Sequence, residues 1–101
     1  MLQSQKVGNE LHVSFEPGSK LNMGQANNVK AEFAKLVQGN GGKMLLDMRN
    51  LDYVDSSGVG ALLSLLRNCR EHKWELKLVN LQPSVKDLFS LLQLHTIFSI
   101  G

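Results

Sequence analysis

The spacing of hydrophobic residues predicts strands in the first part of the chain. Leu11, Val13 and Phe15 alternate with polar residues, and a period of two is typical of a half-buried strand. Residues 2–7 have a weaker alternation, and Gly8-Asn9 between the two segments is a candidate two-residue hairpin turn. We therefore expect the chain to begin with an antiparallel pair of strands.

Helical spacing predicts three amphipathic helices further along. After a loop that begins at residues 17–19, the first helix has Asn22 as its candidate N-cap and ends at the glycines of residues 39–42. The second helix follows residues 55–57, and Pro83 suits the first position of the third. The core faces consist of apolar residues three or four positions apart: Ala26, Val29, Phe33, Leu36 and Val37; Val59, Leu62, Leu63 and Leu66; and Val85, Leu88, Phe89 and Leu92.

Two short apolar runs between the helices, at 44–48 and 76–80, predict strands, the first of them buried on both faces. Residues 51–54 are interpreted as a connection, and residues 94–100 as a candidate last strand. The element order is therefore β-β-α-β-α-β-α. Strands that alternate with helices need crossover connections, so we expect an α/β fold with a mixed, largely parallel sheet of four to five strands and three to four helices. A chain of 101 residues has the length of a single domain, which we place at 1–101.

Composition and charge narrow the class of protein. The formal net charge is +2 without a run of like charges, so nothing indicates nucleic-acid binding. No apolar run approaches the roughly 20 residues that span a bilayer, and the first residues contain no apolar signal core. Cys69 is the single cysteine, which excludes an internal disulfide and fits a reducing compartment. We expect a cytoplasmic protein without a membrane segment.

An acid, two hydroxyls and two glycines lie where the second helix is expected to begin. Asp55 or Ser56 is the candidate N-cap, because short polar side chains accept hydrogen bonds from the free N–H groups of a first helical turn. Gly58 and Gly60 each lower helix propensity by roughly 1 kcal/mol relative to alanine. This cost indicates that another element of the fold, or a second molecule, comes close to this turn.

Other chemical interpretations of the sequence are weaker. Residues 39–43 lack the first glycine and the final hydroxyl of a phosphate-binding loop, and they precede a strand. Ser56, on a turn between strand and helix, resembles a hydrolase nucleophile elbow, but Val54 replaces the first glycine and no histidine is placed beside the serine. A metal would need more ligands than the scattered histidines and the acids of this region supply, which are Asp47, Asp52 and Asp55. We expect no metal, no cofactor and no enzymatic activity.

Residues 55–60, Asp-Ser-Ser-Gly-Val-Gly, resemble the signature of STAS domains, in particular of the small bacterial anti-sigma factor antagonists. The segment 45–60 is similar to the third strand and phosphorylation loop of that family, and residues 78–89 are similar to its last strand and helix. Two motifs at the right separation, with a matching order of elements, extend the resemblance over nearly the whole chain.

The resemblance implies a partner-switching mechanism in the regulation of transcription. Such antagonists are phosphorylated on the serine after the motif aspartate, which is Ser56 here. The kinase is the anti-sigma factor, a member of the histidine-kinase-like superfamily, and a separate serine phosphatase restores the antagonist. The unphosphorylated antagonist binds the kinase and so releases a sigma factor, and the ATP and magnesium belong to the kinase. We expect the residues around Ser56 to contact the partner, namely Asn22, Asp55, Ser57, Gly58, Val59 and Gly60. Of these, Val59 is expected to be an exposed apolar contact.

One position departs from the family pattern. Members usually carry an acidic residue after a leucine in the loop before the first helix, where it contributes to phosphorylation or kinase contact, but this chain has Leu21-Asn22. Asn22 keeps the hydrogen-bonding shape without the charge. A STAS module that binds a partner constitutively, as a scaffold or a subunit of a larger assembly, is therefore the alternative function. The sequence leaves the oligomeric state open between a monomer and a weak homodimer.

Overall fold

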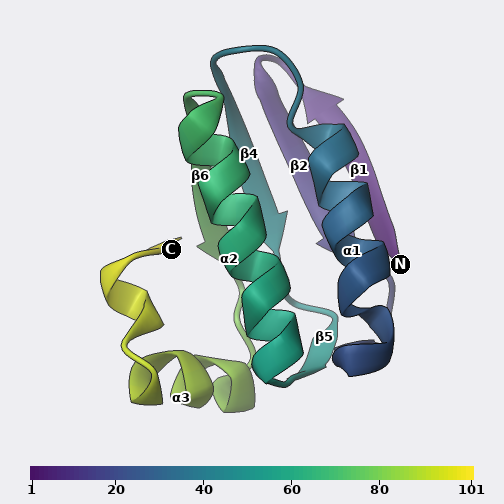
Figure 1. The fold of residues 1–101 in the computed structure, drawn as a ribbon, viewed down its shortest axis with the longest axis vertical. Coiled ribbons are helices and arrows are strands. Elements are labelled where there is room, and N and C mark those ends of the chain that lie inside the picture. Colours follow the sequence, from purple (N-terminus) through teal and green to yellow (C-terminus); the bar gives the residue numbers. More distant parts are fainter.

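Five strands form the main sheet of the computed structural model, which describes residues 1–101 (Figure 1). They are β1 (Leu2–Val7), β2 (Glu10–Phe15), β4 (Gly42–Asp47), β6 (Trp74–Val79) and β7 (Ser99–Ile100), in the spatial order β1-β2-β4-β6-β7. β1 and β2 are antiparallel, and all other neighbours are parallel. The prediction of an α/β fold with a mixed, largely parallel sheet is confirmed.

The hairpin between β1 and β2 forms at the predicted turn. Val7 is paired with Glu10, which leaves Gly8-Asn9 as a two-residue loop. Gly8 has a φ of +63°, a conformation that glycine adopts without the steric penalty of a Cβ and that tight hairpin turns require. The turn therefore fixes the register in which alternate residues of β2 face the core.

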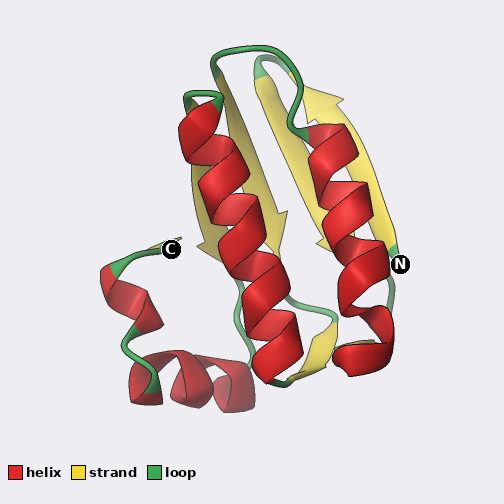
Figure 2. Ribbon diagram, in the orientation of Figure 1, coloured by secondary structure: helices red, strands yellow, loops and turns green.

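Two long helices cover one face of the main sheet (Figure 2). α1 (Met23–Leu36) leads to β4, and α2 (Ser56–Glu71) leads to β6, so each helix returns the chain to the start of a parallel strand. α3 (Pro83–Leu91) lies beside the lower end of α2 in Figure 1, and the short 3₁₀ helix η1 (Leu94–Thr96) connects it to β7. None of these helices combines the length and hydrophobicity that crossing a bilayer demands.

The core fills the space between this helical layer and the sheet. Its members recur with a period of two along the strands and every three or four residues along the helices, as the sequence predicts. The largest side chains with no more than 1% exposure include Phe15, Phe33, Leu46, Leu62, Leu65, Leu78 and Phe89.

Two segments differ from the sequence-based expectation. The predicted loop and connection contain strands β3 (Ser19–Leu21) and β5 (Leu51–Val54), which pair in parallel as a separate two-stranded sheet. Both strands are too short to show a clear period, and each needs a partner far away in the chain. The predicted last strand at 94–100 is a strand only at its end, since η1 occupies its first part.

The substitutions Leu65→Ala and Leu91→Ala test the position of the core. Leu65 in α2 is 0% exposed, whereas Leu91 at the end of α3 is 79% exposed. We expect Leu65→Ala to lower the free energy of unfolding by about 2–5 kcal/mol, because it leaves a cavity, and Leu91→Ala to change it by less than about 0.5 kcal/mol. Urea unfolding followed by circular dichroism measures both values, and equal losses would contradict the packing of α2.

Candidate functional site

The carboxylate of Asp55 joins the N-termini of the two long helices. Asp55 is the N-cap of α2, where its Oδ1 accepts a hydrogen bond from the Gly58 N–H at 2.9 Å. Its Oδ2 accepts a second bond, at 3.1 Å, from the N–H of Met23, the first residue of α1. Each helix start carries N–H groups without a helical partner and a partial positive charge, so one carboxylate stabilises both ends.

Asn22 occupies the predicted N-cap position of α1, but its side chain makes no capping hydrogen bond. Its backbone carbonyl accepts the N–H groups of Gln25 and Ala26 at 3.0 and 2.9 Å. The expected capping by the Asn22 side chain is therefore wrong, and the only side-chain acceptor at this helix start is Asp55, which binds the N–H of Met23. The half-buried Asn22 side chain remains available for other contacts.

Gly58 and Gly60 differ in whether the fold requires a glycine at their position. A Cβ on Gly58 would lie 2.2 Å from the backbone oxygen of Leu21, which also accepts the Asp55 N–H at 3.2 Å. Gly58 thus lets α2 approach β3, and this close contact lies within the fold, as one of the two expectations had it. A Cβ on Gly60 would meet nothing within 4 Å, so no contact inside the protein accounts for this glycine.

The residues predicted to contact a partner divide into exposed and buried ones. Ser56 is exposed, while Asp55, Ser57 and Gly60 are half-buried. Gly58 is buried, and Val59 is only 8% exposed. The expectation of Val59 as an exposed apolar contact is wrong, because its position in the first turn of α2 directs the side chain into the core.

Two exposed apolar residues that the sequence reasoning missed border Ser56. Met23 is 77% exposed and is tied to Asp55, the neighbour of Ser56, through its backbone N–H. Tyr53 in β5 is 48% exposed and lies three residues before the serine. Met23 could not be placed here from the sequence, because its contact spans 32 residues. Tyr53 could not be placed either, because exposure does not alternate along β5, where Asp52 and Tyr53 are both exposed.

A hollow of about 230 Å³ extends this surface towards α3. It opens between β5 and α3, and Tyr53, Val54 and Leu88 contribute most of its apolar lining. Gln82, just before α3, donates hydrogen bonds to the carbonyl of Arg49 at 2.7 Å and to Asp52 at 2.9 Å. These bonds fix the start of α3 to the segment that precedes the Ser56 turn.

His72 and Cys69 do not assist nucleophilic catalysis at Ser56. His72 follows the last residue of α2 and so lies about 24 Å along the helix from Ser56. Cys69 is 1% exposed, and burial raises the pKa of its thiol to about 11, so the reactive thiolate is scarce at neutral pH. The structure has no group of three or more histidine, cysteine or acidic side chains arranged to hold a metal.

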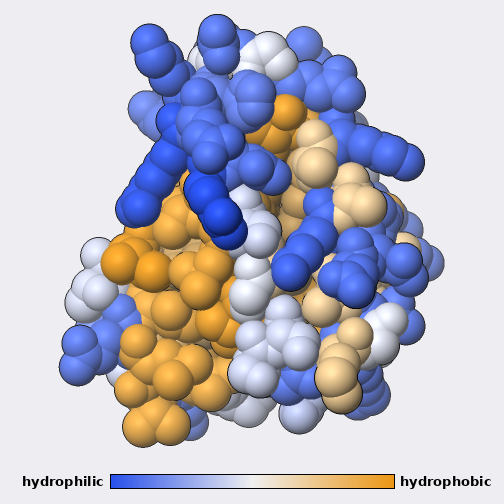
Figure 3. Space-filling view, viewed as in Figure 1, coloured by the Kyte–Doolittle hydropathy of each residue, from blue (hydrophilic) through white to orange (hydrophobic).

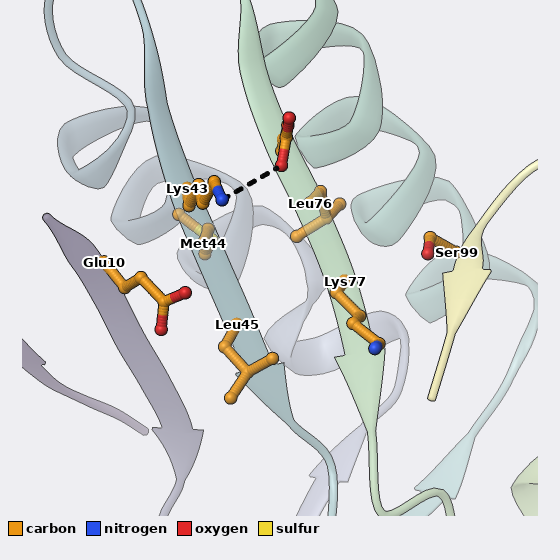
Figure 4. Close-up of a pocket in the computed structure, with 8 residues that line it drawn as sticks. Glu10, Lys43, Met44, Leu45, Leu76, Lys77 and Ser99 are labelled. Atoms are coloured by element: carbon orange, nitrogen blue, oxygen red, sulfur yellow. Dashed lines mark ion pairs between the residues drawn. The ribbon is translucent and has the colours of Figure 1, made fainter.

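The largest hollow of the protein lies away from this site (Figure 4). It has a volume of about 410 Å³ and lies on the sheet face that the helices leave open, around Leu45. Lys43 and Glu75, near the amino ends of β4 and β6, form an ion pair of 3.9 Å beside it. Ser56 follows the carboxyl end of β5 on the helical side, so the hollow has no part in the serine site.

The fold and this site define the class of protein: the chain belongs to the STAS family, whose domain model matches residues 3–101. Among its relatives is BtrV of Bordetella bronchiseptica, described as a proposed anti-sigma factor antagonist. BtrV is 30% identical over 81 residues, which make up 80% of this chain and 70% of BtrV.

Solved structures share the fold over the whole length. The anti-sigma factor antagonist SpoIIAA in its unphosphorylated form has a TM-score of 0.76 at 20% identity, covering 100% of this chain and 88% of SpoIIAA. SpoIIAA of Bacillus has also been solved in its phosphorylated form. A STAS domain protein from Planctomyces limnophilus, an anti-sigma-factor antagonist, has a TM-score of 0.82 at 14% identity, covering 98% and 87% of the two chains.

Alanine at the two glycines separates their roles. We expect Gly58→Ala to destabilise the protein by more than about 1 kcal/mol, because the new Cβ would collide with backbone rather than with a flexible side chain. Gly60→Ala should instead raise stability by up to about 1 kcal/mol, since alanine has the higher helix propensity and meets no neighbour. Thermal and urea unfolding measure both changes, and a stable Gly58→Ala protein would refute the close contact with Leu21.

Replacing Asp55 tests the shared cap. Asp55→Ala removes the acceptor of two helix starts, so we expect a loss of about 1–3 kcal/mol in unfolding free energy. Asp55→Asn keeps one side-chain oxygen and should lose less unfolding free energy than Asp55→Ala. Hydrogen exchange at the amides of Met23 and Gly58 is the specific readout. If exchange speeds up only at Gly58 in Asp55→Ala, the bond to α1 contributes nothing.

Proposed function

We propose that this protein is an anti-sigma factor antagonist of a partner-switching system, which binds a serine kinase when unphosphorylated and is released by phosphorylation of Ser56. The observation that carries the proposal is the exposed Ser56 hydroxyl at the first position of α2, next to a carboxylate already engaged by two helix starts. Kinship with BtrV and the fold shared with SpoIIAA support the same role.

The charge change at Ser56 suits a switch of binding. A phosphoryl group adds about −1.5 to −2 charges next to the Asp55 carboxylate, on a surface that also exposes the apolar side chains of Met23 and Tyr53. A partner that covers these side chains would have to remove water from the new charge, which weakens the complex. The Ser56 side chain projects from the fold, and the helix N-terminus favours negative charge, so the domain stays folded.

The complete system divides the chemistry between proteins. The kinase supplies ATP and magnesium, a separate serine phosphatase removes the phosphoryl group, and this protein carries out no catalytic step itself. Gly60 leaves room for the kinase, because a Cβ there would meet nothing within 4 Å and a partner can approach the α2 backbone near Ser56.

A constitutive binding module is the second candidate, and Asn22 is the observation that favours it. An acid at this position would place a further negative charge at the N-cap of α1, near Ser56. Asn22 supplies neither that charge nor a capping bond. If the missing acid is required for phosphoryl transfer, the same surface binds its partner without being switched.

Intact-mass analysis tests the switch directly. The protein is incubated with ATP, magnesium and a lysate of the source organism, and we expect the gain of one phosphoryl group. Ser56→Ala should gain none, whereas Ser4→Ala, a control at an exposed serine of β1, should gain the group as the parent does. Asn22→Asp should be phosphorylated faster than the parent, because it restores the acid that the family usually has.

Two outcomes would change the conclusion. If Ser56→Ala gained a phosphoryl group, the phosphorylated residue would be one other than Ser56. No gain in any variant, with protein that is folded by circular dichroism and a lysate that phosphorylates another substrate, would favour the constitutive module.

A further inference from the structure

Exposed leucines gather beside α2 and over α3. Figure 3 shows a continuous hydrophobic area over this part of the molecule, below a rim of strongly hydrophilic side chains. Leu91, Leu92 and Ile97 are 79%, 49% and 41% exposed. Together with three partly buried leucines they form what we call the α2–α3 patch: Leu63, Leu66, Leu88, Leu91, Leu92 and Ile97.

The α2–α3 patch contains more apolar side chains than α3 needs in order to pack against the core. Val85 and Phe89 fix α3 to the core with 2% and 1% exposure, while the leucines near its end face outwards. Single exposed apolar residues are common on protein surfaces, but a contiguous group usually marks a contact with another molecule. Leu88 also lines the hollow beside Tyr53, so the patch continues to the edge of the Ser56 site.

Two unpaired arginines of α2 border the patch, and the last residue of the helix is one exposed acid, Glu71. Arg67 and Arg70 are exposed and make no ion pair, and they follow Leu63 and Leu66 by four residues, one helical turn further along. The arginines could simply complement the C-terminal end of the helix dipole. Their place next to uncovered leucines, however, gives the apolar surface two free cations along its α2 edge.

We propose that the α2–α3 patch docks an acidic amphipathic helix of the protein partner. Leucines of two neighbouring helices receive the apolar side of such a helix, and Arg67 and Arg70 pair with carboxylates along its flank. This inference rests on the proposed function only in assuming that a protein partner exists. The inference adds a second binding site for the partner, which we call the second anchor, besides the one around Ser56. It also specifies that the partner carries negative charge at this second anchor.

The anchor lies on the same exposed side of α2 as the candidate switch. Ser56, Gly60, Leu63 and Arg67 are spaced by three or four residues and so follow one another along the outward side of the helix. A partner that covers the patch and reaches the start of α2 therefore contacts both. Only such a partner feels both the arginines of the patch and the charge of a phosphoryl group on Ser56.

Photo-crosslinking in the source organism tests the surface. A photoreactive phenylalanine analogue replaces Leu91 in one strain and Gln5, an exposed residue of β1 on the far side of the sheet, in the control strain. We expect the probe at 91 to react with a peptide that has leucine-type residues every three or four positions and a surplus of aspartate and glutamate. The probe at 5 should not react with that peptide.

The crosslinked partner is then purified for affinity measurements. Arg67→Glu with Arg70→Glu should weaken binding at least tenfold and remove most of its salt dependence. Leu91→Ser should weaken it at least tenfold while the urea midpoint stays unchanged. The charge-matched control, Lys43→Glu with Lys77→Glu on the open face of the sheet, should change affinity less than twofold.

Each other result would overturn the proposal. These results are crosslinks only to a second copy of this chain, a partner segment without surplus acids, no crosslink beyond that of the control, or equal effects of the two charge reversals. Ser56 phosphorylation is measured by mass in the same cells. A loss of the switch with an intact crosslink would reject the proposed phosphorylation alone, and the reverse result would reject the docking surface alone.

Discussion

The arrangement of the helical layer depends on one carboxylate. Asp55 accepts one N–H from the start of α1 and one from the start of α2, and its own N–H donates to Leu21 in β3. The missing side chain of Gly58 allows α2 to lie against the same carbonyl of Leu21. Because Asp55 and Leu21 take part in all of these contacts, the start of α1 is tied to the Ser56 turn.

This constraint explains why a modification beside the shared cap can change a surface without unfolding the domain. Both oxygens of Asp55 already have donors, so the cap is complete without Ser56. The serine occupies the first helical position, where its N–H needs no helical partner and its side chain is exposed. The protein thus keeps its stabilising contacts on one side of the turn and presents the modifiable hydroxyl on the other.

The sequence predicts the strands and helices in which hydrophobic residues recur at a regular spacing. The hairpin, four of the main strands and all three α-helices follow from alternation, helical spacing and turn residues, and Asp55 is recognisable as a cap from its place before α2. The β3–β5 pair, the second bond of Asp55 and the exposure of Met23 depend on contacts across about 30 residues, which no local pattern records. Val59 shows the opposite error, since membership of a motif suggested exposure while its helical position already indicated the core.

The distance along α2 limits how the two anchors can communicate. Arg67 is eleven residues from Ser56, about 16 Å along the helix axis, whereas charges are screened over about 8 Å at physiological ionic strength. A phosphoryl group on Ser56 therefore leaves the attraction at the arginines nearly unchanged within this protein. Only a partner that touches both ends couples them, so phosphorylation removes one of two anchors instead of abolishing contact outright. Release then depends on how much affinity the second anchor retains, and the leucines between the two ends set that value.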